Sequence, residues 1–357
     1  MTTSRAWSLA GAVGLVGAAA VTGATVRATR MLRRRATLAA GEAALGSLTG
    51  QVHRIVARDG LCLHVQVDEP AHPRPDAPTV VLTHGWGLTS QSWHYQRAAL
   101  RESYRVITYD QRSHGDSEWS PPEGSTIEQL ASDLHAVVDA LAPTGPVALV
   151  GHSMGAMAIM ALAEQAPSFV AERIAAISLI ATSPGHFGRH AHGLPATSLT
   201  RLSPLLRGTV ERAPWLVEAP RRLAADLAYD AVRRYGFGSS PREAHVAFAD
   251  RMLAAAPVSV YTAFWPLFVQ LDLSDVLPAF VGLPTLIVVG ERDVITPPRH
   301  SRRLAEAIHT AELVVLPDSG HLLMLERHAE LNELLLALLE RAGQPSGAAA
   351  AADAVDS

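Results

Sequence analysis

The chain has 357 residues, of which 48% are hydrophobic and 18% charged, and its formal net charge is −4. This length suffices for one large core with a sizeable insertion. Every basic residue is an arginine, and the absence of lysine excludes a Schiff-base enzyme and a lysine-dependent phosphate loop. The balanced charge argues against a nucleic-acid partner, because nucleic-acid binding requires many phosphate contacts.

The first 35 residues have the composition of a membrane segment. No charged residue lies between Arg5 and Arg27, and as a helix this run would span about 30 Å of hydrocarbon. Five arginines at residues 27–35 favour a cytoplasmic position for the domain that follows. We therefore expect a membrane anchor, followed by a connector at residues 36–50. A signal peptide cleaved near residues 18–24, with export of the protein, and a soluble or peripheral helix are the alternatives.

Short apolar runs alternate with helical segments from residue 51 onward. Residues 51–57 and 61–67 predict a hairpin around Asp59 and Gly60. Further strands are expected at 79–83, 105–109, 146–150, 174–181, 284–289 and 312–316, and helices at 127–141, 156–165 and 300–308. Apolar strands separated by helices predict a parallel sheet covered on both faces. The alternation around Cys62, the only cysteine, predicts a buried thiol.

The alternation stops at residues 183–277, which contain helical patches such as 222–233 but no clear strand. Because this segment is inserted between two core strands, we expect a helical cap over the carboxyl edge of the sheet. The core would then comprise residues 51–182 and 278–341. Residues 342–357 are Ala-rich and polar, and a disordered tail is expected there.

A serine lies between two glycines where a buried strand should pass into an Ala-rich helix. The segment 149–157 reads LVGHSMGAM, with Ser153 at its centre. A phosphate loop would need more glycines and a lysine, and a packing turn gives no reason for the serine. A G-x-S-x-G motif between strand and helix is typical of a nucleophile elbow. There the serine is strained, and side chains at Gly151 and Gly155 would collide with neighbouring elements.

A nucleophilic serine requires a base, and the base requires a carboxylate that orients it. His321 follows the last predicted strand in VVLPDSGHLLML, and Asp293 follows the preceding one in PTLIVVGERDVITPP. Both are therefore expected at the same sheet edge as Ser153. Glu291 is the alternative carboxylate. The side chain of His152 is expected to project away from the serine hydroxyl.

An acyl-transfer site also needs donors for the oxyanion of the tetrahedral intermediate. The backbone N–H of Met154, at the start of the helix, and that of Trp86, in VLTHGWGLT, are the candidates. His84 is expected to stabilise the turn before Trp86 by a hydrogen bond. No group of carboxylates and histidines has the spacing of metal ligands, so neither a metal nor a cofactor is expected.

Together these motifs resemble the α/β-hydrolase superfamily over residues 52–338. HGWG matches its oxyanion loop, YDQRSHGDS the segment after the next core strand, GHSMG the elbow, GERDVITP the acid loop and SGH the base. The resemblance implies an α/β fold with a mostly parallel eight-stranded sheet, flanking helices and a helical cap after the sixth strand. It also implies that Ser153 is the nucleophile, Asp293 the orienting acid and His321 the general base and acid. Members that open epoxides or displace halide carry aspartate in place of the serine, and the usual glycine of RGHG is Ser113 here.

The cap segment 261–269, YTAFWPLFV, is crowded with aromatic and aliphatic residues. It forms either the packing core of the cap or an apolar acyl pocket, whose expected lining residues are Trp93, Phe264, Trp265 and Phe268. We expect a membrane-associated serine hydrolase that cleaves carboxylic esters, lipid-like ones among them. A C–C bond hydrolase, a cofactor-free haloperoxidase or perhydrolase, and a non-catalytic ligand-binding member of the fold are the alternatives.

Overall fold

The computed structural model describes residues 45–185, 190–191, 194–195 and 225–343. The chain divides into two units between Ala44 and Leu45, and the second unit contains the fold. The expected anchor or signal at residues 1–35, most of the connector and the tail from residue 344 lie outside the described residues.

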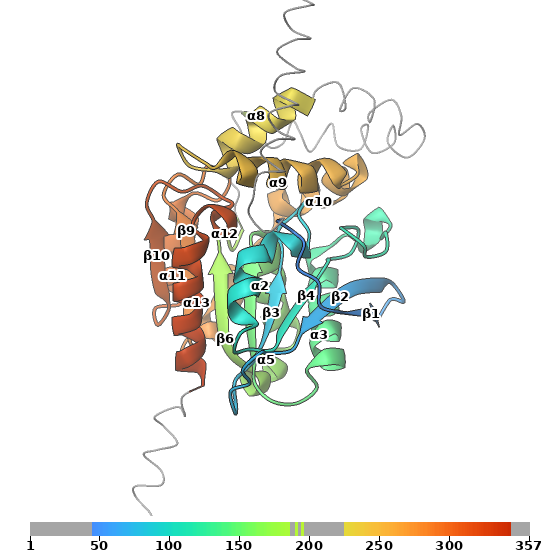
Figure 1. Cartoon of the computed structure of the whole chain (residues 1–357), viewed down its shortest axis with the longest axis vertical. Helices are drawn as coiled ribbons and strands as arrows, with labels where there is room; N and C mark the ends of the chain where they lie inside the picture. The colour runs from blue at the N-terminus through green and yellow to red at the C-terminus, as the bar shows by residue number, and fades with distance from the viewer. Residues whose placement is uncertain (1–44, 186–189, 192–193, 196–224, 344–357) are drawn as a thin grey trace, which may run out of the picture. The chain divides into compact units, whose positions relative to one another are not determined.

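An eight-stranded sheet with the strand order β1-β2-β4-β3-β5-β6-β9-β10 forms the centre of the second unit (Figure 1). The strands are β1 (Gln51–Val56), β2 (Cys62–Asp68), β3 (Thr79–Thr83), β4 (Val106–Tyr109), β5 (Val147–His152), β6 (Ile174–Ile180), β9 (Thr285–Gly290) and β10 (Glu312–Leu316). β2 pairs antiparallel with β1 and β4, and the remaining pairs are parallel. The predicted strands and the mostly parallel eight-stranded sheet are confirmed.

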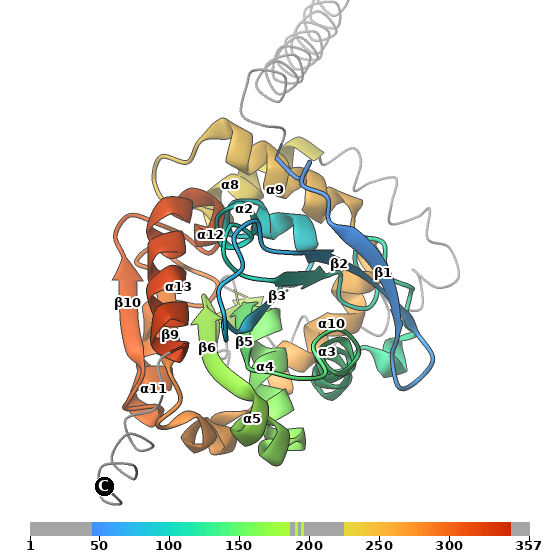
Figure 2. The same ribbon diagram turned by 60° about the horizontal axis from the view of Figure 1, so that its bottom comes forward.

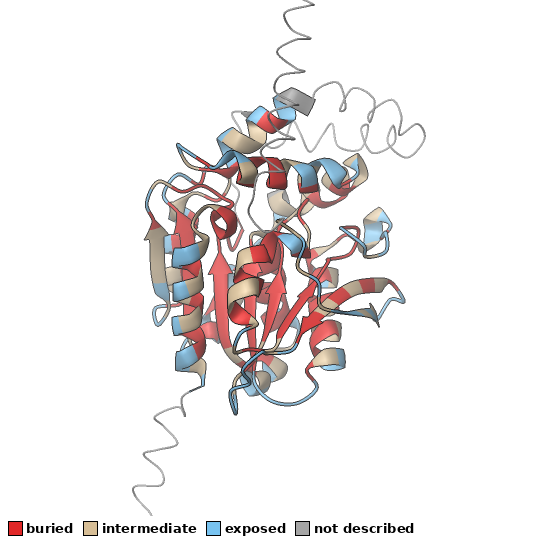
Figure 3. Cartoon of the chain, viewed as in Figure 1, coloured by how far each residue is buried: buried red, intermediate tan, exposed pale blue. Residues whose placement is uncertain are grey.

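The burial of the strands follows from what covers them (Figure 3). All residues of β4, β5 and β9 are buried, because helices cover both faces of the sheet there. In β2, by contrast, buried and half-buried residues alternate, because only one face is covered. Cys62 lies on the outer face and accepts a hydrogen bond from Nε of Arg54 at 3.1 Å. The expectation of a buried thiol at Cys62 is wrong, since the alternation places Leu63 rather than Cys62 on the core face.

Helices cover the sheet on both faces. α3 (Ile127–Leu141), α4 (Met154–Gln165) and α11 (Pro298–Ala307) contribute to one apolar core, and α2 (His94–Leu100) and α13 (His328–Ala342) to the other. The connecting elements are η1 (Ser90–Trp93), η2 (Pro122–Gly124), α5 (Pro167–Arg173), η3 (Ser274–Phe280) and α12 (Leu323–Glu326). α3 begins after Thr126, whose side chain accepts the N–H of Gln129 and so satisfies a free amide of the first turn.

The insertion after β6 is helical where the structure describes it. It contains α8 (Ala225–Gly236), α9 (Glu243–Ala255) and α10 (Val258–Gln270). A short hairpin of β7 (His190–Ala191) and β8 (Leu194–Pro195), which the sequence patterns do not predict, precedes them. The three helices lie beyond the ends toward which the parallel strands point (Figures 1 and 2). This is the carboxyl edge of the sheet, where open α/β folds bind their ligands.

Within the described ranges, no single helix is both long and apolar enough to cross a membrane. α4 and α5 satisfy the length and composition of a span only as a pair bent by 107°.

Candidate active site

Ser153 occupies a strained turn between β5 and α4. Its backbone angles are φ 52° and ψ −116°, a conformation that non-glycine residues rarely adopt. A Cβ at Gly155 would lie 2.2 Å from the carbonyl oxygen of Thr83, and one at Gly151 would lie 2.6 Å from the backbone nitrogen of Ala156. The glycines on both sides of the serine are thus sterically required, as the sequence predicts.

His321 and Asp293 meet at the same edge of the sheet. Nδ1 of His321 lies 2.8 Å from Oδ2 of Asp293, and the exposed fractions of the two residues are 7% and 2%. A carboxylate accepts hydrogen bonds, so Nδ1 carries the proton and Nε2 is left free to accept one. The alternative carboxylate, Glu291, is exposed and accepts the backbone N–H of Asp318 at 3.0 Å.

Thr296 supports the carboxylate, although the sequence patterns did not single it out. Its hydroxyl donates to Oδ2 of Asp293 at 2.7 Å, and the backbone N–H groups of Ile295 and Thr296 donate to Oδ1 at 2.8 Å each. Burial by itself would raise the pKa of the Asp293 carboxyl. The charge of His321 and the hydrogen bonds from His321 and Thr296 outweigh burial and lower that pKa below its usual value. The local pattern that could have indicated this turn is a threonine three residues after an aspartate in a loop, because the aspartate side chain can then accept hydrogen bonds from the residues that follow it.

The Ser153 side chain is half-buried, and its hydroxyl forms no hydrogen bond with any residue in the described part of the chain. The residue before it, His152, contacts His321 instead: its Nε2 lies 3.0 Å from the His321 carbonyl oxygen. The ring centroids of these two histidines are 4.7 Å apart. The end of β5 and the loop that carries His321 are therefore in direct contact.

Two buried histidines hold the loop that follows β3. Nδ1 of His84 donates to the carbonyl oxygen of Gly85 at 2.8 Å, while its Nε2 accepts the N–H of Gln111 at 2.9 Å. Nε2 of His114 accepts the N–H of Gly87 at 3.0 Å. Burial lowers the pKa of His84 to about 4 and that of His114 to about 3, so both rings are neutral at neutral pH. The predicted turn-stabilising hydrogen bond of His84 is confirmed.

The loop after β3 carries the backbone amide of Trp86, one of the two expected oxyanion donors. The backbone N–H of Gly87 donates to His114 and that of Leu88 to the Gly85 carbonyl, whereas the backbone N–H of Trp86 has no acceptor among the described residues. A Cβ at Gly85 would lie 3.2 Å from Cβ of Ser153, so the loop runs directly past the serine. Met154 is the first residue of α4, where backbone N–H groups have no helical acceptor.

Residues 80–334 match the family model described as the alpha/beta hydrolase family, which is more than half of the chain. The protein belongs to the α/β-hydrolase family. As a member of this family, with hydrolases among its relatives, it is an enzyme of the hydrolase class.

Similar proteins include hydrolases of two kinds. The α/β-hydrolase described here is 29% identical to the "Putative carbamate hydrolase RutD" of Variovorax paradoxus, over 79% of this chain and 98% of that protein. It is 30% identical to the protein of the same name from Klebsiella pneumoniae, over 70% of this chain and 86% of that protein. A solved thermophilic esterase from Thermogutta terrifontis superposes with a TM-score of 0.66 at 25% identity, covering 83% of this chain and all of that one.

An aromatic group joins the Trp86 loop of this α/β-hydrolase to the cap. The Trp86 ring lies 5.2 Å from Tyr261, 6.2 Å from Trp265 and 5.0 Å from Phe268, centroid to centroid, and all four side chains are half-buried. The tyrosine hydroxyl donates to the carbonyl oxygen of Leu253 at 2.6 Å. We call Trp86, Tyr261, Trp265 and Phe268 the aromatic wall.

Two of the four expected pocket residues do not belong to this wall. Trp93 and Phe264 each have 0% of their surface exposed. Trp93 packs in the core formed with α2 and α13, and Phe264 packs in the core on the opposite face of the sheet. Neither side chain has exposed surface in this structure, whereas Trp265 and Phe268 are half-buried.

The residue at the usual glycine of RGHG, Ser113, retains the glycine-like conformation with φ 65°. Its hydroxyl oxygen accepts the backbone N–H of Ser120 at 2.9 Å, which offsets the strain of a positive φ at a residue with a side chain.

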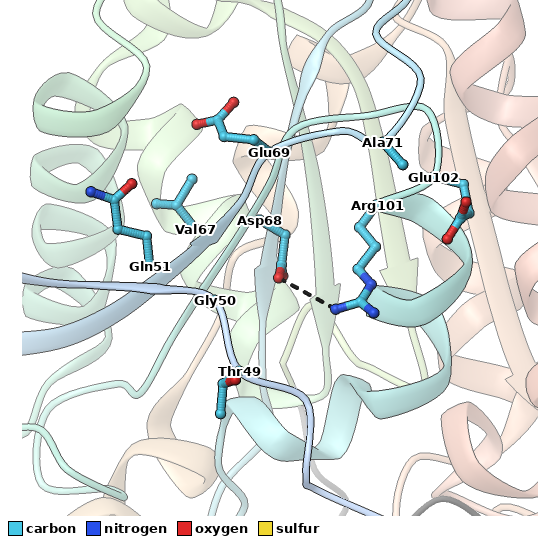
Figure 4. A pocket seen from close by; sticks show the side chains of 9 residues that line it. All are labelled: Thr49, Gly50, Gln51, Val67, Asp68, Glu69, Ala71, Arg101 and Glu102. Atoms are coloured by element: carbon cyan, nitrogen blue, oxygen red, sulfur yellow. Dashed lines mark ion pairs between the residues drawn. The ribbon is translucent and has the colours of Figure 1, made fainter.

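A separate polar pocket of about 470 Å³ lies at the opposite edge of the sheet (Figure 4). It is lined by Thr49, Gly50, Gln51, Val67, Asp68, Glu69, Ala71, Arg101 and Glu102. Asp68 pairs with Val106, the first residue of β4, so the pocket lies at the amino ends of the parallel strands, away from Ser153. Its buried acid, Asp68, is already paired with Arg97 and Arg101.

One group of potential metal ligands occurs among the described residues, namely His64, Asp110 and Asp116. Both carboxylate oxygens of Asp110 already accept backbone hydrogen bonds, one from Ser90 at 2.7 Å and one from Asp116 at 3.0 Å. These bonds fix the loops after β3 and β4, which is a structural role.

Proposed function

We propose that Ser153, His321 and Asp293 act as a catalytic triad that hydrolyses carboxylic esters through an acyl-enzyme intermediate. The observation that carries the proposal is the Asp293–His321 hydrogen bond of 2.8 Å, formed next to a strained serine at the carboxyl edge of the sheet. Asp293 orients the imidazole, and its lowered pKa keeps it ionised at neutral pH. The free Nε2 of His321 is then the base available to the serine hydroxyl.

In the proposed reaction, Oγ of Ser153 attacks the ester carbonyl carbon while Nε2 of His321 takes the hydroxyl proton. The resulting oxyanion accepts hydrogen bonds from the N–H groups of Trp86 and Met154. Collapse of this intermediate breaks the C–O bond, and the leaving alkoxide receives the proton from His321. Water then repeats the sequence on the acyl-enzyme, releases the acid and regenerates the serine. The Ser153 hydroxyl must turn toward His321 for the first step, as hydrogen bonds at catalytic sites commonly tighten only when substrate is bound.

The aromatic wall is suited to binding an apolar acyl or aryl group, so we expect this part of the ester to determine which substrates bind. No charged residue occurs in α10, and the ring of Trp86 lies beside the amide that we assign to the oxyanion. Such a surface gains free energy by covering apolar substrate area and offers no ion pair to a charged one. Lipid-like esters are included in this class.

Carbamate hydrolysis is the second candidate, because the RutD relatives carry that name at 29% and 30% identity. Carbamates present the same carbonyl carbon to the same nucleophile, so the proposed triad would serve both reactions. Comparing kcat/KM for p-nitrophenyl esters of two to eight carbons with that for aryl carbamates distinguishes them. Peroxide-dependent bromination, measured beside these assays, tests haloperoxidase chemistry.

Labelling with a fluorophosphonate probe tests the nucleophile directly. The wild type and Ser47→Ala, an exposed serine elsewhere, should each bind one probe per chain, whereas Ser153→Ala should bind none and lose esterase activity. All three proteins should have the same melting temperature. A folded wild type that stays unlabelled would contradict the proposed function.

We further propose that the 21 uncharged residues between Arg5 and Arg27 anchor the enzyme to a membrane, with the hydrolase domain on the cytoplasmic side. The full chain should then resist carbonate extraction, a variant without residues 1–44 should be extracted, and protease added to intact cells should leave the domain uncut. Recovery of a shortened chain outside the cell would instead indicate a cleaved signal peptide.

A further inference from the structure

His152, the residue before the proposed nucleophile, has a hydrogen-bond arrangement that fixes its tautomer. Only 1% of its surface is exposed, and its Nε2 lies 3.0 Å from the His321 carbonyl oxygen. A carbonyl oxygen can only accept, so Nε2 carries the proton and Nδ1 carries none. Nδ1 is buried, has no hydrogen-bond partner in the part of the chain that the structure describes, and faces the loop after β3, since a Cβ at Gly85 would lie 2.6 Å from it.

The ring of His152 is held in place by its neighbours. It packs edge-on against Trp93 with 6.5 Å between ring centroids, and its centroid lies 4.7 Å from that of His321. Burial, followed by the charge of His321, lowers the pKa of His152 well below its usual value. Asp293 and His84 also act on this ring, in opposite directions. His152 therefore stays neutral, and it is a fixed donor rather than a carrier of protons.

His152 binds the backbone carbonyl of His321, the proposed general base, whose imidazole must lie within reach of Ser153. His321 lies in a loop between β10 and α12, not in a regular element, and Asp318 in this loop has a positive φ of 46°. The cap holds the residues on both sides, because Leu322 donates to the Gly236 carbonyl at 2.7 Å and Ser239 donates to Asp318 at 2.7 Å. Among the described residues, His152 is the donor to the carbonyl of His321 itself.

We propose that His152 is a positioning residue, whose Nε2–H binds the His321 backbone carbonyl and so sets the distance from the His321 imidazole to Ser153. Because His152 and Ser153 are consecutive at the end of β5, this bond ties the base to the strand that carries the nucleophile. The inference rests on the proposed function. A displacement of about 1 Å at a reacting group can cost on the order of 100-fold in rate.

Two substitutions separate the donor from the shape of the ring. His152→Gln keeps an N–H donor at a similar reach, and we expect its kcat to stay within about threefold of the wild type. His152→Phe keeps a planar ring but has no donor, and its kcat should fall by about 10- to 100-fold with KM changed less than twofold. Equal kcat values in the two variants, or a loss confined to KM, would overturn the proposal.

Proton and nitrogen NMR of the uniformly labelled protein supply a second readout that does not depend on activity. In the wild type at pH 7, His152 should show a single Nε2–H tautomer, and the His321 Nδ1–H shared with Asp293 should give a low-field resonance. That resonance should persist in His152→Gln and broaden or disappear in His152→Phe. An Nδ1–H tautomer, or a doubly protonated His152 ring at pH 7, would overturn the proposal even if the phenylalanine variant does not fold. A wild type that fails to react with the fluorophosphonate probe while showing these signals would refute the proposed function but not the contact.

Discussion

Asp293 and His321 are 28 residues apart in the chain, yet Oδ2 of the first lies 2.8 Å from Nδ1 of the second. The contact arises because β9 and β10 pair in parallel register, so the loops that leave their carboxyl ends lie side by side. It fixes both the orientation and the tautomer of the imidazole. The proposed catalysis depends on this hydrogen bond.

Replacing Asp293 by asparagine should therefore lower kcat by about 10³- to 10⁴-fold, because the amide can donate to Nδ1 and so favours the wrong tautomer. The measurement is steady-state hydrolysis of a p-nitrophenyl ester. Glu291→Gln is the matched control in the same loop, since glutamine keeps an oxygen for the Asp318 N–H. Equal losses in the two variants would assign the effect to the loop rather than to the carboxylate.

Gly155→Ala should destabilise the fold and abolish activity. The new Cβ would lie 2.2 Å from the Thr83 carbonyl oxygen, and this contact is with backbone that cannot move aside. We expect a loss of about 3 kcal/mol or more in the free energy of unfolding, measured with urea. Gly343→Ala is the control, because its nearest neighbours would be at 3.8 Å. A stable, active Gly155→Ala variant would show that the backbone around Thr83 can move to accommodate a Cβ at this position.

The two neutral histidines that hold the loop after β3 should make the stability of the protein sensitive to mild acid. Burial lowers the pKa of His84 to about 4 and that of His114 to about 3, from 6.5 in the unfolded chain. Between pH 6.5 and about 4 the unfolded state thus binds more protons, and the free energy of unfolding falls as the pH falls. In this range each histidine should lower the free energy of unfolding by about 1.4 kcal/mol for each pH unit of acidification.

Urea unfolding at pH 7, 6 and 5 measures this slope. His114→Gln removes one titrating group and keeps an acceptor for the Gly87 N–H. It should therefore reduce the slope of unfolding free energy against pH by the contribution of one histidine. His309→Gln, which replaces an exposed histidine outside this loop, is the matched control. Identical slopes in the wild type and His114→Gln would mean that His114 takes up its proton in the folded protein as well.

The aromatic wall should determine which acyl groups the enzyme accepts. Trp86→Ala retains the backbone N–H assigned to the oxyanion but removes the ring that contacts Tyr261, Trp265 and Phe268. We expect kcat/KM for an octanoate ester to fall by about 10-fold or more and that for an acetate ester to change little. Trp119→Ala removes an exposed tryptophan outside the wall and serves as the control. An equal loss on both esters would place the tryptophan ring in the chemical step rather than in substrate selection.

Sequence alone was sufficient for the features that are encoded locally. Strand and helix periodicity identified the sheet, and Gly151 and Gly155 around Ser153 identified the elbow, because a strained turn against a strand leaves no room for a Cβ. The order of the motifs likewise placed Asp293 and His321 after successive strands. The strands, the helices and the glycine-flanked turn each depend mainly on the residues of one short segment.

The tertiary structure decided the contacts between segments. It distinguished Asp293 from Glu291 as the partner of His321, and it revealed the support from Thr296. It also placed Trp93 in the core and joined His152 to the carbonyl of a residue 169 positions away. Such contacts depend on strand order, register and side-chain packing across the whole fold, and no pattern within one short segment specifies them.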